Sequence, residues 1–500
     1  MHRRSRPLAV LLVSLFISVF SFSQSAAPLR VDDLVSALKG TQVELPTTNK
    51  ILKKQVEDRG VAFETSESID GELKRAGATD ELIGTIRLWL CDKFQKQAEA
   101  CDKNDIDCRI KNYTKALEFH SNDDVVMVDR GNAYQDKKQY DAAIADFSSA
   151  IEIDNKGAVT YYNRGNAYYR KNDFERAIQD YSRAIELDPK DASSFNNRGL
   201  AYYWSDQYDK SVKDFSSYIA LKPKEADGYE NRGDSYLEMG SYDEALRDFS
   251  KAISLDAKNA DLYVGRGRAY NGKGKYDEAI KDFDKSLSID KASAHAYHNR
   301  GYTNFLRNRL DEAIADYTRS IELRPSAGSF SDRANAYLAK KDFERAKADY
   351  TKAIELDPKD YVAYYYRAEM ALDHLNDLES ALVDIRKAIE LNPKDVDSYF
   401  IRGNIYIDIE DYVAALADFD KVIGMDPKSS NAFTNRGLIH IRTENFAAAV
   451  RDLTEAIKLD PKNATAYENR AIAYEELGDT VKADADNKKA AELNSKQGKP

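Results

Sequence analysis

The sequence has little of several residues that mark particular protein classes. Its 500 residues include only 3 Cys, too few to build a disulfide-dense scaffold of this size. With 23 Gly and 11 Pro it is neither collagen-like nor of low complexity. Beyond residue 27, no segment is long and apolar enough to cross a membrane. These absences leave a chain that folds around an ordinary apolar core.

The residues that are abundant support that conclusion. Hydrophobic residues make up 42% of the chain and Tyr alone contributes 32, so extensive disorder is excluded. The 74 Lys and Arg are outnumbered by 85 Asp and Glu, which gives a net charge of −11. Nucleic-acid binding selects for basic stripes, so we expect no nucleic-acid partner.

Residues 1–27 have the pattern of a secretory signal peptide. Arg3, Arg4 and Arg6 precede an uncharged run from Leu8 to Phe22, and small residues ending at Ala27 follow. That run is shorter than the ~20 residues a membrane-spanning helix needs. We predict a cleaved signal and a periplasmic or secreted protein. An uncleaved membrane anchor is the alternative, and it would be the only membrane contact.

A single sequence period organises most of the remaining chain. Its marker is an Arg followed by Gly or Ala, with an aromatic residue three positions earlier and often a Tyr four positions later. The marker stands at Arg130, Arg164, Arg198, Arg232, Arg266, Arg300, Arg333, Arg367, Arg402, Arg436 and Arg470. The interval from Arg130 to Arg164 recurs throughout, except that it is one position shorter before Arg333 and one longer before Arg402. A second apolar set with helical spacing follows each marker, so each repeat is predicted to be two short amphipathic helices joined by a tight turn.

Helix stop and start signals agree with this prediction. Proline, which disfavours the helical conformation of the residue before it, ends the second helix at positions such as Pro189. Asp191, Asp360, Asp395 and Asn463 then stand where they can cap the next first helix.

The pattern resembles the tetratricopeptide repeat, and it recurs eleven times across residues 124–497. Residues 90–123 resemble a degenerate further copy. The resemblance implies an all-α solenoid of about twelve helix-turn-helix units, coiled as a right-handed superhelix with a concave groove, in a secreted bacterial repeat protein. Residues 28–89 lack the period and are predicted to form a small helical N-terminal cap, with helices at 31–38, 49–59, 68–76 and 80–90. Residues 498–500 are assigned to a tail.

Every marker Arg is followed by an Asp at a constant distance along the chain, with one extra position after Arg367. The acidic positions are Asp146, Asp180, Asp214, Asp248, Asp282, Asp316, Asp349, Asp384, Asp418, Asp452 and Asp486. We interpret them as structural Arg–Asp pairs, because every marker Arg has one carboxylate at a fixed position in the same repeat. A basic ladder for an anionic ligand is the alternative.

The resemblance also implies where a partner binds, namely one face of each first helix. In the third and fourth helix pairs this face holds Tyr162, Asn163, Asn166, Tyr169, Asn196, Asn197, Tyr203 and Trp204, and later His295, His298, Asn299, Tyr302 and Tyr365. An amide can donate and accept at once, which suits a peptide backbone, although the Asn residues could equally bridge neighbouring helices. Aromatic rings beside amides also suit sugar faces.

Cys101 and Cys108 flank the turn of the degenerate repeat, so they could form a disulfide in an oxidising compartment, leaving Cys91 over. No His lies within that hairpin, and we predict no metal site and no cofactor. The sequence holds no phosphate-binding Gly loop, no Gly-x-Ser-x-Gly and no His-Glu-x-x-His, so we predict no enzyme.

These features predict an extracytoplasmic scaffold that mediates protein–protein interaction by holding an extended partner segment in its groove. The alternative is an envelope component for polysaccharide export or secretion, which binds a glycan or a membrane complex.

Overall fold

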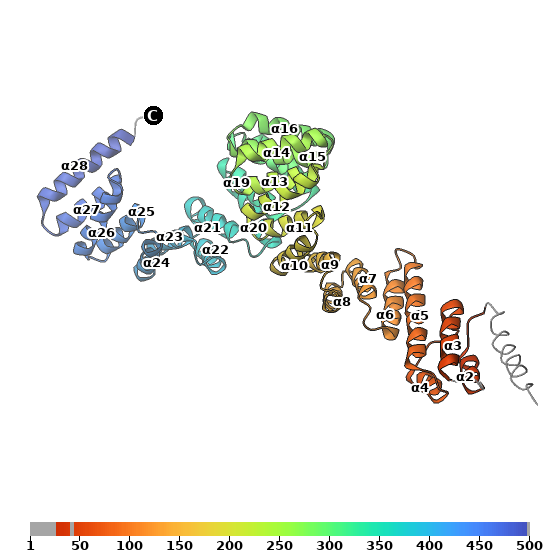
Figure 1. Cartoon of the computed structure of the whole chain (residues 1–500). Helices are drawn as coiled ribbons and strands as arrows, with labels where there is room; N and C mark the ends of the chain where they lie inside the picture. The colour runs from red at the N-terminus through yellow and green to blue at the C-terminus, as the bar shows by residue number, and fades with distance from the viewer. Residues whose placement is uncertain (1–26, 41–44, 498–500) are drawn as a thin grey trace, which may run out of the picture. The chain divides into compact units, whose positions relative to one another are not determined.

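The computed structural model describes residues 27–40 and 45–497 (Figure 1). This part of the chain contains 27 helices, α2 to α28, and no strand; a single bridge pairs Leu29 with Val61. The all-α class predicted from the sequence is confirmed. The predicted signal peptide, apart from its last residue, and the predicted tail lie outside the described residues.

The helices fall into two compact units, Met1–Leu255 and Asp256–Pro500. In the first, the repeats begin with α7 (Asp124–Asp136), α8 (Tyr140–Ile153), α9 (Ala158–Arg170), α10 (Phe174–Leu187), α11 (Ala192–Tyr203), α12 (Tyr208–Leu221), α13 (Ala226–Glu238) and α14 (Tyr242–Leu255). The second holds α15 (Ala260–Gly272), α16 (Tyr276–Ile289), α17 (Ala294–Leu306), α18 (Leu310–Leu323), α19 (Ala327–Ala339), α20 (Phe343–Leu356), α21 (Tyr361–Leu375), α22 (Leu378–Leu391), α23 (Val396–Asp408), α24 (Tyr412–Met425), α25 (Ser430–Arg442), α26 (Phe446–Leu459), α27 (Ala464–Glu476) and α28 (Thr480–Gln497). The paired helices predicted from the period are confirmed, and the right-handed superhelix stays a prediction.

The N-terminal region comprises α2 (Val31–Lys39), α3 (Leu45–Arg59), α4 (Glu67–Arg75), α5 (Asp80–Glu99) and α6 (Ile106–Phe119). The boundary predicted between residues 89 and 90 falls inside α5, which pairs with α6. The helix continues because Cys91, Phe94 and Ala98 extend one buried face and no helix breaker interrupts it. One apolar cluster runs from Leu29 to Val126, so this region packs continuously onto the first repeat.

In most repeats a small residue of the first helix packs against an aromatic ring of the second. At Gly267, for example, an added Cβ would lie 2.5 Å from Cε1 of the buried Phe283. Glycine therefore sets how closely the two helices can approach.

The turn inside each repeat passes through one left-handed residue. These residues are Lys138, Asn172, Asp206, Gly240, Gly274, Asn308, Lys341, Asn376, Glu410, Glu444 and Gly478, with φ between 53° and 81°. Only three of them are Gly, so most repeats accept a strained backbone at this point.

All eleven predicted Arg–Asp pairs are present, which confirms their structural interpretation. Each Arg donates from Nε and from a terminal nitrogen to the two carboxylate oxygens, over 2.6–2.9 Å. The carboxylates are buried. This bidentate geometry fixes the first helix of a repeat to its second helix.

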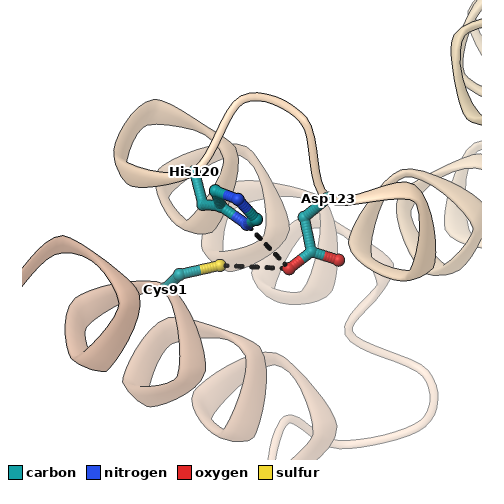
Figure 2. A group of neighbouring side chains, drawn as sticks. All are labelled: Cys91, His120 and Asp123. Atoms are coloured by element: carbon teal, nitrogen blue, oxygen red, sulfur yellow. Dashed lines mark hydrogen bonds and ion pairs between the residues drawn. The ribbon is translucent and has the colours of Figure 1, made fainter. Parts of the chain in front are cut away.

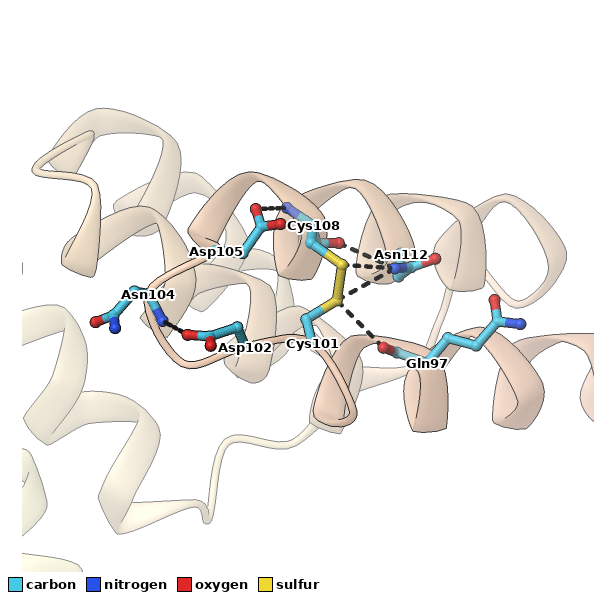
Figure 3. The surroundings of a disulfide bond; sticks show 7 residues. All are labelled: Gln97, Cys101, Asp102, Asn104, Asp105, Cys108 and Asn112. Atoms are coloured by element: carbon cyan, nitrogen blue, oxygen red, sulfur yellow. Dashed lines mark hydrogen bonds between the residues drawn. A yellow bond between two sulfur atoms is a disulfide. The ribbon is translucent and has the colours of Figure 1, made fainter.

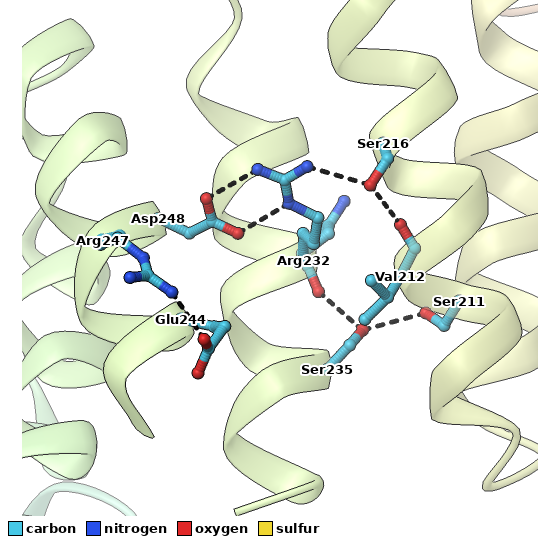
Figure 4. Close-up of polar contacts among 9 residues, drawn as sticks. Ser211, Val212, Ser216, Arg232, Ser235, Glu244, Arg247 and Asp248 are labelled. Atoms are coloured by element: carbon cyan, nitrogen blue, oxygen red, sulfur yellow. Dashed lines mark hydrogen bonds and ion pairs between the residues drawn. The ribbon is translucent and has the colours of Figure 1, made fainter. Parts of the chain in front are cut away.

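The remaining terminal nitrogen reaches the preceding repeat. Figure 4 shows Arg232 of α13 bound to Asp248 of α14 and also donating to Ser216 Oγ of α12, over 2.9 Å. The same contact is made to Thr114, Ser148, Ser182, Asp284, Thr318, Thr351, Asp420 and Thr454 in other repeats. One guanidinium thus links three helices. We missed this contact in the sequence, although a column of Ser, Thr or Asp at a nearly constant interval before every marker Arg except Arg402 signals it.

In most repeats, the aromatic residue three positions before the Arg and the Tyr that often follows four positions later flank the same guanidinium. The Arg198 carbon Cζ lies 5.8 Å from the ring centre of Phe195 and 5.9 Å from that of Tyr202. Arg470 lies similarly between Tyr467 and Tyr474. Cation–π contact and exclusion of water both strengthen the ion pair. Many of the 32 Tyr are therefore part of the Arg site.

We expect Arg232→Lys to destabilise the first unit by about 2 kcal/mol. Lys keeps the positive charge, but it cannot make the two hydrogen bonds to Asp248 together with the one to Ser216. Chemical denaturation followed by circular dichroism measures the change. The matched control is Arg247→Lys, whose partner Glu244 lies on the same helix and whose side chain is 70% exposed (Figure 4). The control should change stability by less than about 0.5 kcal/mol. Equal effects of the two substitutions would contradict the structural role.

Candidate functional site

The predicted groove residues fall into two groups, one in each unit. The first group comes from α9 and α11, and Trp204 directly follows α11. The second group comes from α17 and α21. Four members of the first group line a cavity.

That cavity has a volume of about 710 Å³ and is formed by α7, α9 and α11 together with the turn after α7 and the first residue of α8. Its lining includes four predicted residues, Tyr162, Asn166, Tyr169 and Asn197. It also includes Gln135, Asp136, Lys138, Tyr140, Arg170 and Leu200, which we did not name from the sequence. Gln135 follows Arg130 by five residues, as Tyr169 follows Arg164, so the repeat could have identified it. Lys138 and Arg170 do not stand at the position five residues after a marker Arg, nor at any other position from which the repeat predicts a groove residue. The sequence therefore did not identify them.

The amides of this group bind one another across adjacent first helices. Asn197 Nδ2 donates to Tyr162 Oη over 3.1 Å and to Asn166 Oδ1 over 2.9 Å. Asn163 Nδ2 donates to Asn132 Oδ1 over 3.0 Å. The helix-bridging role that the sequence left open is therefore observed for these residues.

Asn196 takes part in the same way. Its Oδ1 accepts from Asn231 Nδ2 over 3.1 Å, and its own Nδ2 lies 3.3 Å from Asn197 Oδ1. These hydrogen bonds between Asn side chains, which we call the amide network, thus connect the first helices from α7 to α13.

The amide network leaves donors available at the cavity. Asn166 Oδ1 also accepts from the buried Tyr181 hydroxyl over 2.7 Å, whereas its Nδ2 has no partner among the described residues. Tyr162 Oη accepts from Asn197, so its own proton is free to be donated. Burial raises the pKa of Tyr169 and Tyr181, which keeps both phenols protonated. The cavity can therefore donate hydrogen bonds to a carbonyl group.

Two aromatic side chains extend this surface. Trp204 is 59% exposed, and its ring centre lies 5.4 Å from that of Tyr203 in an edge-to-face contact. Tyr203 packs in the same manner on Tyr208, over 5.6 Å. The Tyr203 ring thus contacts both Tyr208 and Trp204, and the Trp204 ring stays largely exposed.

The charges at the cavity are mainly basic. Asp136 is paired with Arg109 over 2.7 Å. Lys138 and Arg170 have no acidic partner in the described part of the chain. The site therefore favours an anionic group on its ligand.

In the second group, His298 is engaged within the packing of α17 against α19. Its Nδ1 lies 3.1 Å from Ser329 Oγ, and its Nε2 lies 3.2 Å from Asp332 Oδ2. Burial lowers the pKa of His298 and raises the pKa of Asp332 to about 6.

The other members of the second group lie at the surface or bind neighbours on their own helix. Asn299 Nδ2 donates to the His295 carbonyl over 2.9 Å, and Tyr365 Oη donates to Glu369 over 3.1 Å. His295 and Tyr302 are exposed. Burial raises the pKa of Tyr365.

Figure 3 shows a disulfide between Cys101 and Cys108, whose Cα atoms are 6.0 Å apart. It closes the turn between α5 and α6, where Asp105 caps α6 by accepting from Cys108 N over 2.9 Å. Cys91 is the free and buried cysteine. The structure brings Cys91 beside His120, the histidine that the sequence placed beyond the hairpin.

Several family models match this chain. A TPR repeat model matches residues 131–172, 165–204, 233–274 and 441–478, and tetratricopeptide repeat models match 258–326, 327–360, 349–383 and 385–417. Together these matches cover more than half of the chain. No curated protein sequence matches it.

Solved structures share a limited likeness with this chain. A tetratricopeptide repeat protein from Parabacteroides merdae is 20% identical, with 51% of this chain and 98% of that one covered and a TM-score of 0.41. Yeast Tom70 is 18% identical, with 83% and 99% covered and a TM-score of 0.40. YrrB, described as a TPR protein with an unusual peptide-binding site, is 24% identical, with 39% and 97% covered and a TM-score of 0.32.

We expect Asp332→Asn to raise the melting temperature at pH 7.5 and to change it little at pH 4. The folded state holds the Asp332 proton up to about pH 6, whereas the unfolded chain releases it near pH 4. The contribution of Asp332 to native stability therefore falls as pH rises from about 4 to 6, and the substitution removes that loss. Asp484→Asn, on the exposed face of α28, is the control and should leave the pH profile unchanged. Parallel profiles for wild type and Asp332→Asn would contradict this expectation.

Proposed function

We propose that this chain, which belongs to the tetratricopeptide repeat family, is a scaffold that holds an extended segment of a partner protein against α9 and α11. Repeat proteins of this family generally mediate protein–protein interaction and are typically non-catalytic. The observation that carries the proposal is the cavity of about 710 Å³ at which amides, phenols and two cations meet.

An extended segment suits the donors at this cavity. Its backbone carbonyls repeat at regular intervals, and Asn166 Nδ2 and the Tyr162 hydroxyl can donate hydrogen bonds to them. Such bonds do not depend on the side chains of the partner segment. The amide network fixes both donors before binding, which reduces the ordering cost of association.

The charges and aromatics add selectivity. Lys138 and Arg170 favour acidic side chains on the partner segment, because neither has an ion pair within the described residues. Trp204 offers a flat apolar surface for an anchoring side chain at the edge of the site. We therefore propose a partner segment that combines acidic residues with an apolar one.

Peptides selected against the full chain from a random displayed library should include acidic sequences. Their affinity for the double variant Lys138→Glu, Arg170→Glu should fall at least tenfold, about 1.4 kcal/mol, because attraction becomes repulsion. Titration calorimetry with a synthesised peptide measures this. Trp204→Ala tests the apolar anchor separately.

The matched control is Lys213→Glu, Lys251→Glu, which makes the same charge change at exposed positions of the second helices α12 and α14. Equal loss in the two double variants would show a non-specific charge effect and contradict the site. A glycan array run on the same variants tests the alternative of an envelope polysaccharide component. Glycan binding that depends on Trp204, without peptide binding, would favour that alternative.

We also propose that the protein works outside the cytoplasm, in the periplasm or as a secreted protein. The pattern of residues 1–27 supports export. The Cys101–Cys108 disulfide supports an oxidising compartment, where such bonds persist. Among the described residues, no helix is both long and apolar enough to span a membrane.

Protein recovered from the envelope fraction should begin after Ala27, and its unreduced, denatured chain should contain one reactive thiol, that of Cys91. Intact mass spectrometry after alkylation measures both. Cys91→Ser should abolish the remaining reactivity and serves as the control. Three reactive thiols, or retention of the segment that ends at Ala27, would contradict this assignment.

A further inference from the structure

We propose that Cys91, His120 and Asp123 form a binding site for a divalent transition metal of the zinc type. Cys91 lies on α5, His120 directly follows α6, and Asp123 directly precedes α7 (Figure 2). This site is separate from the cavity at α9 and α11 and does not depend on the proposed function.

Two of the three separations between the donor atoms already match those around a bound metal. The Cys91 sulfur is 3.7 Å from Asp123 Oδ2, and His120 Nδ1 is 3.3 Å from the same oxygen. All three donor atoms lie within 4.8 Å of one another. A tetrahedral zinc ion with bonds of about 2.0–2.3 Å holds its ligand atoms roughly 3.3–3.7 Å apart. The oxygen–sulfur and oxygen–nitrogen separations therefore match a bound ion, and the sulfur and nitrogen lie within 4.8 Å of each other.

The backbone holds each ligand in place. Asp123 Oδ1 accepts from Val126 N over 3.1 Å and caps α7, which leaves Oδ2 directed at the other two side chains. Cys91 is 3% exposed within the apolar cluster. The His120 backbone nitrogen donates to the Ala116 carbonyl over 3.1 Å at the end of α6. A site held in this way loses little entropy when the ion binds.

The surroundings also favour a cation. The thiol, imidazole and carboxylate form a donor set that suits zinc and cobalt better than magnesium or calcium. Within the described chain, His120 is the only chargeable basic group paired with Asp123. The His120 side chain is 41% exposed, so the ion can enter and water can take a fourth position.

The competing interpretation is a hydrogen-bonded triad that holds the α6–α7 turn on α5 without an ion. Cobalt distinguishes the two, because a bound cobalt thiolate has a charge-transfer band in the near ultraviolet. With Cys101 and Cys108 in their disulfide, Cys91 is the thiol available to produce that band.

The experiment is a Co²⁺ titration of the full, unreduced chain. We expect one equivalent to bind with a thiolate band and tetrahedral visible bands, and Zn²⁺ to displace it. Cys91→Ser should abolish the thiolate band. His120→Gln and Asp123→Asn should each weaken binding at least tenfold, and Asn retains the cap of α7.

The control is His440→Gln on α25, which should bind Co²⁺ as the wild type does. Circular dichroism of every variant shows whether it has folded. Binding without a thiolate band, or a band that persists unchanged in both His120→Gln and Asp123→Asn, would overturn the site. The absence of any binding would leave the hydrogen-bonded triad as the correct interpretation.

Discussion

The buried ion pair between an Arg of the first helix and an Asp of the second is the interaction on which the repeats depend. Each Asp is buried, so without its Arg it would carry an uncompensated charge in a medium of low dielectric. The same guanidinium reaches back to the preceding second helix in most repeats, as Arg232 does to Ser216. One side chain therefore sets the spacing within a repeat and between repeats, and the flanking aromatics keep water from it.

Because the Arg fixes the second helices, the exposed face of the first helices is free to vary. On α9 and α11 that face carries amides, which link the first helices as the guanidinium links the second. On α17 the positions that correspond to Asn197 and Asn166 carry Asn299 and Tyr302, and the neighbouring His298 packs against α19. One scaffold thus presents two chemically different surfaces, and the one at α7, α9 and α11 is hollowed and basic.

The features that could be predicted from the sequence are those that recur in every repeat. The helix pairs and the Arg–Asp pairing were predictable because eleven copies repeat the same spacing. The left-handed turn was not, since residues such as Lys138 and Glu410 occupy it in most repeats and Gly in only three. The length of α5 and the meeting of Cys91 with His120 depend on packing in the one copy that departs from the pattern. Lys138 lines the cavity from the turn after α7 and Arg170 from the end of α9, at positions that are not among those the repeat predicts to line the groove.

That divergent copy explains why unusual chemistry gathers at α5 and α6. One period before Arg130 and Asp146 stand Lys96 and Asn112, so this helix pair lacks the ion pair. Lys96 binds Asp92 on its own helix, and Asn112 Nδ2 contacts the two sulfurs of the disulfide over 3.5 and 3.6 Å. A disulfide closing so short a loop contributes about 2–3 kcal/mol, which is similar to what the missing pair would supply. The covalent bond within α5–α6 thus takes the place of the missing ion pair, and the contact of Cys91, His120 and Asp123 adds a link from α5 to the start of α7.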